Sequence, residues 1–564
     1  MNKRMMGIFS PKIAIGLAAF ASLGIGTVAV YKMLERTGES AIRMIPADAA
    51  LIVSLDTSPS PSQVRLYNEI SLAMKDSGMN DFIDNMLAQA DGGQGALKTL
   101  RSHVKGSFAA GAWGDITKGN PDWVTAIAID NSGKAETLVA GASGIRATNH
   151  KGRMFYSAKG APAVITFFGD YCLVSNKPES AERAIAVAND QEASVYDEGG
   201  FQQARESLPQ DAGLMVFLNG KALAEMDEEA RKAFKSLGVD NEGWFAMGAT
   251  LRDEGILIDC SSPLGSGGIP AALNKMENLS FASFESYPTG ALGVAGLSSP
   301  TALYDMMREI IKSDSATESE FDKGIAEVEK QTGLSFENEI LPGFKGEASF
   351  AVYPPETEGS DMRFVMSLDN QHGGKATELA TRLMELVETK KVEGPTFTKA
   401  TEGSWTIYSA DKEKVHIAIG GDKVIVSSST GLARQVAGGD AQSLLYSDAF
   451  SNMSENKNAK FVLQIDTDRL ATLIEKNIGD GGPPIREFLT GKPLTMTWTT
   501  TNNASKTQML IPVDIPAMIR FGGKTVNGGG AAQPMSPGAM GHPGQFPNPA
   551  PQIGESKIVI KKGG

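Results

Sequence analysis

The sequence is poor in cysteine and in positive charge, and each shortage excludes a class of protein. Two cysteines among 564 residues cannot build a disulfide framework or a structural zinc site. Lysine and arginine total 53 against 66 aspartates and glutamates, a net charge of −13, so there is no basic excess to bind nucleic-acid phosphates. Cys172 and Cys260 lie in apolar, strand-like segments, and we interpret them as buried thiols rather than a disulfide.

Catalytic signatures are missing as well. The five histidines are widely spaced and form no pair typical of a metal site, and we expect His416, in an alternating strand, to point to solvent. Gly522-Gly523-Lys524-Thr525 resembles the end of a phosphate-binding loop, but Met518 stands where that loop needs its first glycine. The sequence therefore predicts no catalytic, cofactor-binding or metal-binding residue, and no cofactor.

The acidic residues leave a carboxylate-based hydrolase open, and the aromatic residues leave an apolar ligand pocket open. Asp170 and Asp422 fall in turns, where an aspartate usually bonds the local backbone, and no catalytic carboxylate pair stands out. The five tryptophans lie on or beside expected strands, where core packing explains them better than an apolar ligand pocket does. They are Trp113, Trp123, Trp244, Trp405 and Trp498.

Long apolar runs are absent except near the N-terminus. Residues 1–12 carry basic side chains, and residues 13–31 contain no charge over a length that rises roughly 28 Å as a helix, close to the thickness of a bilayer core. We expect 1–12 to be a cytoplasmic segment and 13–31 a transmembrane anchor, with a cleaved signal peptide as the alternative. Either interpretation places the bulk of the chain outside the cytoplasm, in the periplasm or on the cell surface.

The most informative positive feature is an internal repeat. Pro46–Val53 is similar to Pro288–Ala295, Lys105-Gly106 to Lys345-Gly346, Gly169–Ser175 to Gly421–Ser427, and Leu214–Asn219 to Phe461–Asp466. The offsets of 242, 240, 252 and 247 keep the same order along the chain, as a diverged tandem copy would. We therefore predict module 1 at 47–270, module 2 at 285–516 and a Gly/Pro-rich flexible tail at 517–564.

Each module repeats the same order of strands and helices. An apolar strand (Ala49–Leu55; Ala291–Leu297) leads to amphipathic helices, then to several strands, among them hairpins that turn at Gly169-Asp170 and Gly421-Asp422. This order predicts an α+β fold of mostly antiparallel sheet, with helices packed on one face and the two modules forming a pseudo-symmetric pair of sheets.

Two stretches carry a resemblance to a known family. Ile45–Asp56, shortly after the apolar run, and Thr332–Glu347 resemble an uncharacterised family of secreted or membrane-anchored bacterial proteins that has only a domain-of-unknown-function label. The resemblance covers most of 45–516. It implies an exported bacterial protein and supplies no catalytic residues.

These observations favour a membrane-anchored extracytoplasmic protein that acts by binding or scaffolding in the bacterial envelope. Its expected partners are the inner membrane, through residues 13–31, and an envelope protein. The first alternative is a carrier or sensor of a lipid or other apolar ligand. The second is a hydrolase with carboxylates from both modules.

Overall fold

The computed structural model of the chain describes most of the two expected modules. The described residues are 41–56, 60–78, 103–114, 121–142, 144–158, 163–223, 243–264, 268–311, 315–357, 359–389, 395–410, 412, 414–439, 442–478, 485–501 and 504–528. The expected anchor at 13–31 and most of the expected tail lie outside them. None of the helices within these ranges is long and apolar enough to cross a membrane.

Within these ranges twenty strands form one continuous sheet, and its neighbouring strands pair antiparallel. The first ten are β1 (Leu51–Asp56), β2 (Val104–Trp113), β3 (Asp122–Ile129), β4 (Ile145–His150), β5 (Arg153–Ala158), β6 (Val164–Phe168), β7 (Tyr171–Ser175), β8 (Leu214–Asn219), β9 (Trp244–Arg252) and β10 (Gly255–Pro263). The second ten are β11 (Gly293–Leu297), β12 (Ala348–Tyr353), β13 (Arg363–Asp369), β14 (Thr398–Glu402), β15 (Trp405–Ala410), β16 (Val415–Gly420), β17 (Lys423–Ser427), β18 (Ala459–Ile465), β19 (Leu494–Thr500) and β20 (Ala504–Ile511).

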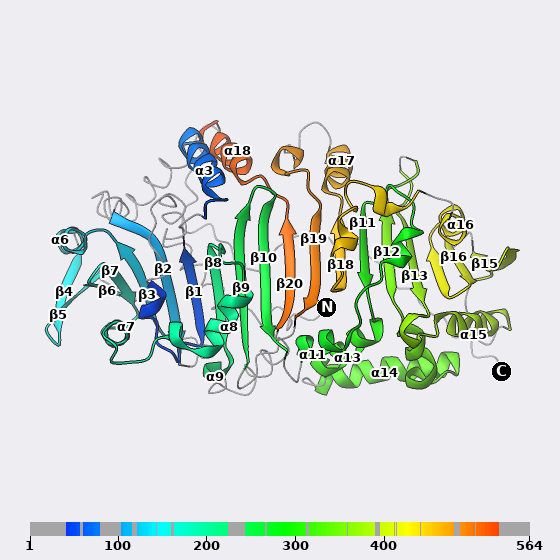
Figure 1. Cartoon of the computed structure of the whole chain (residues 1–564), viewed down its shortest axis with the longest axis horizontal. Coiled ribbons are helices and arrows are strands. Elements are labelled where there is room, and N and C mark those ends of the chain that lie inside the picture. The colour runs from blue at the N-terminus through cyan, green and yellow to red at the C-terminus, as the bar shows by residue number, and fades with distance from the viewer. Residues whose placement is uncertain are drawn as a thin grey trace, which may run out of the picture.

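The two sets of ten strands have the same spatial order, and we call them half 1 and half 2. Half 1 runs β4-β5-β6-β7-β3-β2-β1-β8-β9-β10, and half 2 runs β14-β15-β16-β17-β13-β12-β11-β18-β19-β20. Their last strands, β10 and β20, pair with each other, so the halves join edge to edge in a long sheet (Figure 1). The expected pair of sheets is thus a single sheet, because the closing strands of the two halves complete each other's hydrogen bonding.

The junction has the geometry of a local two-fold axis. Asp259 on β10 lies opposite Gln508 on β20, and the register extends symmetrically to Ile256↔Ile511 and Pro263↔Ala504. Residues related by the sequence offsets occupy equivalent places in the two halves. Ile52 pairs with Gly111 in half 1, and Val294 pairs with Ala351 in half 2. The boundaries 47–270 and 285–516 themselves stay a prediction.

Helices surround the sheet on both faces and along both ends of the strands (Figure 1). In half 1 and the link to half 2 they are α3 (Val64–Asp76), α6 (Ser132–Gly141), α7 (Pro178–Ala188), α8 (Gly199–Ser207), α9 (Gly220–Leu223) and α11 (Gly268–Lys275). In half 2 they are α12 (Ala282–Glu285), α13 (Pro300–Ile311), α14 (Ser315–Thr332), α15 (Ala376–Glu388), α16 (Thr430–Gly438), α17 (Thr467–Ile478) and α18 (Ile515–Gly528).

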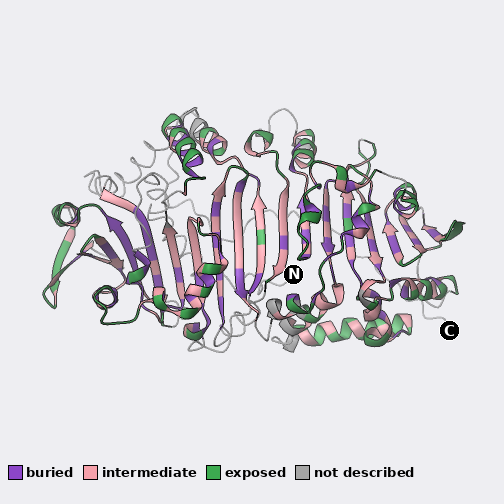
Figure 2. Ribbon diagram, in the orientation of Figure 1, coloured by how far each residue is buried: buried purple, intermediate pink, exposed green. Residues whose placement is uncertain are grey.

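One face of the sheet carries the main cores, and we call it the helical face. In half 1 its side chains pack under α7, α8 and the 3₁₀ helix Ala41–Met44, and in half 2 under α12 and α16. On β9, β18, β11 and β12 the side chains of the opposite face are less buried, so buried and more exposed residues alternate along these strands (Figure 2). Most residues of β10, β19 and β20 are intermediate on both faces. We call the side opposite the helical face on strands β8, β9, β10, β20, β19, β18, β11 and β12 the open face.

The expectation of helices on a single face is wrong. Strand β3 is buried at six successive positions, Val124–Ile129, and therefore needs cover from both sides. Helix α6 supplies the second cover, packing Ala135 and Val139 against Phe108 and Cys172. Burial of both sides of a strand requires helices on both sides of the sheet.

Residues in Thr332–Glu347 mainly end one helix, begin the next and allow two backbone segments to cross closely. Gly333 follows α14 with φ +68°, and Ser335 caps the π-helix Phe336–Ile340, while the Glu339 carboxylate accepts a hydrogen bond from the Ser335 N–H at 2.7 Å. At Gly346 a Cβ would come within 1.9 Å of the Asp369 carbonyl oxygen. Only glycine fits that position, because the two backbones cross in contact.

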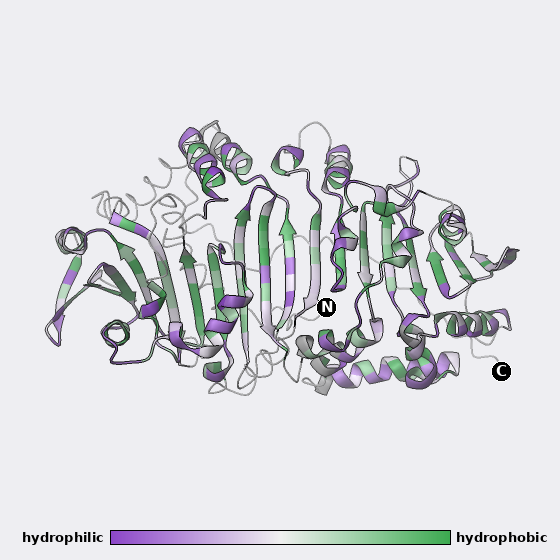
Figure 3. Ribbon diagram, viewed as in Figure 1, coloured by the Kyte–Doolittle hydropathy of each residue, from purple (hydrophilic) through white to green (hydrophobic). Residues whose placement is uncertain are grey.

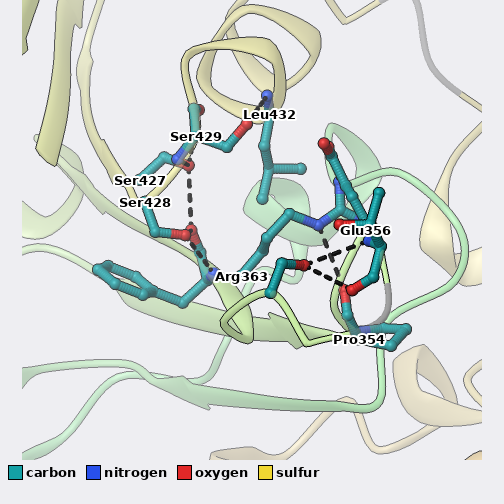
Figure 4. A network of polar contacts seen from close by, with 10 residues as sticks. Pro354, Glu356, Arg363, Ser427, Ser428, Ser429 and Leu432 are labelled. Carbon is teal, nitrogen blue, oxygen red and sulfur yellow. Dashed lines mark hydrogen bonds and ion pairs between the residues drawn. The ribbon is translucent and has the colours of Figure 1, made fainter. Parts of the chain in front are cut away.

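Polar side chains tie β13 to β17 and to the start of α16 (Figure 4). Ser428 Oγ accepts a hydrogen bond from the Phe364 N–H at 2.9 Å, and Ser429 caps α16 by accepting from Leu432 N. Arg363 on the same strand bonds Glu356 at 2.6 Å. The equivalent hydrogen bond in half 1 is made by an asparagine. Asn176 Oδ1 accepts from the Trp123 N–H at 3.2 Å.

Two further expectations are corrected by the structure. His416 is 4% exposed and does not point to solvent; its Nδ1 lies 2.9 Å from Thr430 Oγ1 of α16. Its neighbours in the strand alternate as expected, but His416 is on the side that α16 covers. Helix α18 runs to Gly528, so the first part of the expected tail, including Gly522–Thr525, is helical rather than a phosphate loop.

Candidate functional site

A cleft of about 1100 Å³ opens on the helical face where half 2 approaches the junction. Its floor is the side of β18, β19 and β20 that faces the helices, and its walls are the 446–456 segment, the start of α17 and residues 491–493. It is lined by Glu254, Tyr446, Ser447, Asp448, Ala449, Asn452, Asn456, Val462, Gln464, Asp466, Thr467, Asp468, Arg469, Thr472, Arg486, Gly491, Lys492, Pro493, Thr495, Thr497, Gln508 and Leu510. We call this the central cleft.

The floor of the cleft is polar because alternate residues of three neighbouring strands bring hydroxyl and amide groups to one side. Thr497 lies between Val462 and Gln508 in the cross-strand register, and Thr495 lies next to Gln464. Gln464 is 4% exposed, and its amide donates a hydrogen bond to the Ala449 carbonyl oxygen. That bond fixes the wall segment to the floor and satisfies the buried amide.

The first turn of α17 forms the second wall. Asp466 Oδ1 accepts from the Arg469 N–H at 3.0 Å, an N-cap bond, and Asp466 Oδ2 binds the Arg469 guanidinium at 2.9 Å. Thr467, nearly buried, donates to the Lys492 carbonyl oxygen at 2.7 Å. These bonds fix both sides of the opening, so the cleft has a preformed shape.

Charge in the cleft is balanced. Four acidic side chains and three basic ones line it, and Arg486 at its edge also bonds Thr472 Oγ1 at 2.5 Å and lies 3.8 Å from Glu475 of α17. Tyr446 stands at the rim with 77% of its surface exposed. A cleft with mixed charges, hydroxyls and amides suits a polar ligand better than an apolar one.

The local two-fold axis passes beside the cleft. Gln508 Nε2 donates to Asp259 Oδ1 at 3.0 Å, which joins the two equivalent positions of the halves across the axis. Burial raises the pKa of Asp259, and the hydrogen bond from Gln508 and the charges of Lys506 and Arg252 oppose that rise. Asp259 is a structural partner of the cleft floor rather than part of its lining.

The equivalent place in half 1 is filled. Phe217 stands at the position of Gln464, and Phe201 of α8 packs edge-on against it with 5.2 Å between ring centroids. Gly248 stands at the position of Thr497, and a Cβ there would lie 3.3 Å from Ala212 Cβ, so the chain after α8 rests directly on the strand. A cavity of about 550 Å³ lies beside α8, but Phe217 and Gly248 do not line it.

Half 2 also holds a buried polar group in its core. Tyr287 Oη lies 2.8 Å from Ser349 Oγ and 3.1 Å from Ser367 Oγ, and the two serine hydroxyls are 2.7 Å apart. Burial raises the pKa of Tyr287 to about 12, so it stays neutral. The three hydroxyls satisfy one another and form no cavity, which makes them structural.

Two buried carboxyl groups lie near the start of β12. Glu347 Oε2 accepts from Ser280 N at 2.7 Å and from Ser280 Oγ at 2.9 Å. Asp369, 0% exposed, accepts from the Glu347 N–H at 2.8 Å and the Gln371 N–H at 3.0 Å, and burial raises its pKa. Neither carboxyl group lines the cleft. Asp369 holds the chain crossing at Gly346 through the Glu347 and Gln371 N–H groups, and Glu347 holds the segment before α12 through Ser280.

The residues singled out from sequence do not assemble into a site. Trp113 and Trp244 are buried in the half 1 core, and Trp498 packs on Phe461 at 4.5 Å. Both cysteines are free, as expected; burial raises the pKa of Cys172 to about 12 and that of Cys260 to about 11. Within the part of the chain that the structure describes, no group of three His, Cys, Asp or Glu side chains could hold a metal ion.

Sequence reasoning missed every residue of the cleft. The available signal was the replacement, between the repeats, of Phe217 by Gln464, which stands between the apolar residues Leu463 and Ile465. An amide at a core position indicates either a buried hydrogen bond or a cavity. Comparing the repeats position by position would have identified it.

Comparisons with known proteins bear on family and not on activity. Two solved structures, crystal forms I and IV of TP0453, align with 12% and 11% identity over 42% and 40% of this chain and 82% and 81% of theirs, with a TM-score of 0.23 for each. So low a score carries no argument about fold or function. No curated protein matches the chain.

The family comparison is more extensive. A family described as "Protein of unknown function (DUF3352)" matches residues 105–509, which is more than half of the chain and includes the junction and the central cleft. The sequence resemblance to an uncharacterised domain-of-unknown-function family is therefore confirmed. The chain belongs to the DUF3352 family.

Proposed function

We propose that this protein is a membrane-anchored, extracytoplasmic binding protein of the bacterial envelope, and that it holds a polar ligand or partner segment in the central cleft. The observation that carries the proposal is the difference between equivalent positions. Where half 1 packs Phe201 on Phe217, half 2 has Gln464, Thr495 and Thr497 facing a cavity of about 1100 Å³. A volume of that size accommodates a drug-sized ligand or several residues of a peptide.

The chemistry of the cleft favours binding over catalysis. Asp466 is engaged by Arg469 and by the N-terminus of α17, and Arg486 is engaged by Thr472. Nucleophilic catalysis needs a hydroxyl or thiol in contact with a base. The cleft residues show no such hydroxyl–base contact among the described side chains. A hydrolase would instead need a carboxyl pair, and the cleft lining does bring Glu254 of half 1 near acidic residues of half 2, of which Asp466 is engaged by Arg469. The hydrolase therefore stays an alternative to the binding proposal.

The anchor and the location remain part of the proposal. The uncharged residues 13–31, preceded by Lys3, Arg4 and Lys12, support an inner-membrane span with the modules outside the cytoplasm. We also propose that the halves are homologous and arose by tandem duplication. Support comes from the ordered sequence offsets together with the identical strand order of the two halves.

Location is tested by protease access. In spheroplasts of the native host, external protease should digest the modules while the inner membrane stays intact, and the N-terminal segment should fractionate with that membrane. A cytoplasmic marker protein that resists digestion in the same sample is the control. Recovery of full-length protein from the cytosolic fraction would contradict the proposal.

Binding in the cleft is tested by site-specific photo-cross-linking in living cells. A photoreactive benzoylphenylalanine replaces Tyr446 at the cleft rim, and in a control strain it replaces Leu72, which is 56% exposed on α3. We expect an adduct from position 446 and none from position 72. Introducing Thr497→Lys, which places a long cation in the cleft floor, should reduce the adduct at least tenfold. An unchanged adduct in that variant would show that the cleft is not the site.

A carrier of an apolar ligand is the second candidate. The central cleft does not favour it, because its floor is polar. The open face on the other side of the same strands favours it more, since its positions on β9 and β18 are apolar and partly buried.

A further inference from the structure

Two equivalent 3₁₀ helices end with different residues in the two halves. Val195–Asp197 and Leu444–Tyr446 are equivalent, because each follows a serine that caps it and that pairs with the chain before β1 or β11. The helix ends with Asp197 in half 1 and with Tyr446 in half 2. An aromatic ring therefore stands at the rim of the central cleft, at a position where half 1 has a charged side chain.

Tyr446 turns its ring toward solvent. With 77% of its surface exposed, it is the most exposed large hydrophobic side chain among the described residues, whereas its neighbour Leu445 packs against the half 2 core. Exposed apolar residues that stand singly are common on protein surfaces. This ring, however, lines the central cleft and offers a flat apolar face to whatever occupies it.

Several polar side chains of the cleft have hydrogen-bonding capacity left over. Within the described part of the chain, no side-chain hydrogen bond engages the exposed Asp448 carboxylate or the exposed Asn452 and Asn456 amides. The hydroxyl groups of Thr495 and Thr497 on the floor likewise make none to described residues. An amide donates and accepts, a carboxylate accepts, and a hydroxyl does either. A ligand with many hydroxyl groups matches all three.

The charges of the cleft disfavour an ionic ligand. Arg469 is paired with Asp466 at 2.9 Å. Arg486 bonds Thr472 at 2.5 Å, so both guanidinium groups are already engaged before an anion arrives. A cationic ligand would meet these two arginines and Lys492 in the same lining. The cleft therefore favours a ligand without net charge.

The floor of the cleft cannot pair with the backbone of a peptide. Strand β18 lies between β11 and β19, and β20 lies between β19 and β10, so every floor strand has neighbours on both sides. A peptide that binds by strand addition needs a free edge, and an amphipathic helix needs a hydrophobic groove. Hydrophilic residues instead interrupt β20 in the floor (Figure 3).

We propose that the central cleft binds a neutral oligosaccharide, or a segment of a neutral polysaccharide, with the Tyr446 ring against the C–H face of one sugar. A sugar ring has hydroxyl groups at its edge and C–H groups on its faces, so it uses the polar groups of the cleft and the aromatic ring together. The volume of about 1100 Å³ is at least as large as most small-molecule sites, which suits several linked sugars. This inference rests on the proposed function, because it names the class of ligand in the same cleft.

The experiment identifies what the cleft holds in cells of the native host. Photoreactive benzoylphenylalanine replaces Lys492, an exposed cleft residue, in the full-length protein. After irradiation the protein is purified in denaturant and digested, and the peptide that contains position 492 is analysed by mass spectrometry. We expect an adduct that fragments by successive loss of hexose or N-acetylhexosamine units.

Substitutions of Tyr446 in the same strain test the contact with its ring. Tyr446→Ala should lower the sugar adduct roughly fivefold, because stacking on the ring is lost. Tyr446→Phe keeps the ring and removes the hydroxyl, so it should change the adduct less than about twofold. Leu72→Ala changes another exposed apolar side chain that does not line the cleft, and it is the matched control. Thermal melting confirms that each variant folds.

The other outcomes overturn the inference. An adduct made of amino acids or lipid, or a sugar adduct that carries phosphate or carboxylate groups, would show a different class of ligand while leaving binding in the cleft intact. Equal adduct in the Tyr446→Ala and Tyr446→Phe variants would show that no sugar stacks on the ring. The absence of any adduct from positions 446 and 492 would instead remove the proposed function, and this inference with it.

Discussion

Half 1 and half 2 share one strand order but fill their cores with different chemistry. Ile45, Ala109 and Ala126 belong to the half 1 core. The equivalent residues of half 2 are Tyr287, Ser349 and Ser367, whose hydroxyls lie within 2.7 to 3.1 Å of one another. Three positions far apart in sequence are apolar together in half 1 and hydroxylated together in half 2, because a buried hydroxyl is tolerated only when its hydrogen bonds are satisfied.

The same contrast reaches the junction. Phe217 in half 1 is 2% exposed under Phe201, whereas Gln464 in half 2 bonds the backbone of the cleft wall. The topology therefore does not require an apolar core at these positions. At this position half 1 packs two rings together, and half 2 has a cleft instead.

The largest expected effect comes from removing the packed ring of half 1. Phe217→Ala should lower the free energy of unfolding by about 3–5 kcal/mol, because it leaves a cavity beneath Phe201. Gln464→Ala at the equivalent position should cost only about 1 kcal/mol, since it loses one hydrogen bond beside an existing cleft. Urea unfolding followed by circular dichroism compares the two. Similar losses in both variants would show that the halves are equally packed.

The polar group in the half 2 core gives the next effect. Tyr287→Phe should cost about 1–2 kcal/mol of unfolding free energy, because it removes the hydroxyl that joins Ser349 and Ser367. The triple variant Tyr287→Ile, Ser349→Ala, Ser367→Ala copies half 1 and should lose less than its three single changes summed. Additive losses in the same urea experiment would mean that the three hydroxyls are not coupled.

A pH-dependent effect distinguishes Asp369 from Ala128, its counterpart in half 1. Burial raises the pKa of Asp369 above the ordinary value of 3.8, so the folded state binds the proton more tightly than the unfolded one. The contribution of Asp369 to the unfolding free energy of the wild type is therefore lost as the pH rises through the pKa of the folded state. Asp369→Asn keeps an acceptor for Glu347 N and Gln371 N and stays neutral.

We therefore expect Asp369→Asn to raise the unfolding free energy at pH 7, because the folded state no longer holds a buried negative charge. The difference should disappear below pH 3.8, where the carboxyl is protonated in both states. Unfolding curves between pH 3 and 8 measure this. A variant less stable than the wild type at pH 7 would show that the negative charge is required, for example by Lys423 opposite it on β17.

The smallest expected effect is the reactivity of the two thiols, one in the interior of half 1 and one at the junction. Cys172 is buried and Cys260 half buried, and the pKa values of about 12 and 11 leave both thiols protonated near pH 8. Iodoacetamide should therefore alkylate neither within an hour in the native protein and both in urea. Intact mass spectrometry counts the added groups. Rapid native labelling of Cys172 would contradict the described packing of β7.

Local pattern determined much of what the sequence predicted correctly. The hairpins at Gly169-Asp170 and Gly421-Asp422 form where they were expected, with Phe168 facing Tyr171 and Gly420 facing Lys423. Apolar alternation also identified the strands on either side of these turns. Turn chemistry and period-two alternation involve residues close in sequence, so these features follow from short segments. His416 was misplaced because alternation fixes two faces but not which one a helix covers.

The sequence alone predicted correctly the antiparallel mixture of helix and sheet, the free thiols and the family, and it indicated the repeat that the two halves now support. Tertiary structure alone decided that β10 and β20 join the halves into one sheet, that Gln464 and Thr497 face a cleft and that Tyr446 stands at its rim. The physical reason is distance along the chain. Asp259 and Gln508 are separated by 249 residues, and their contact depends on how two folded halves meet rather than on any local preference.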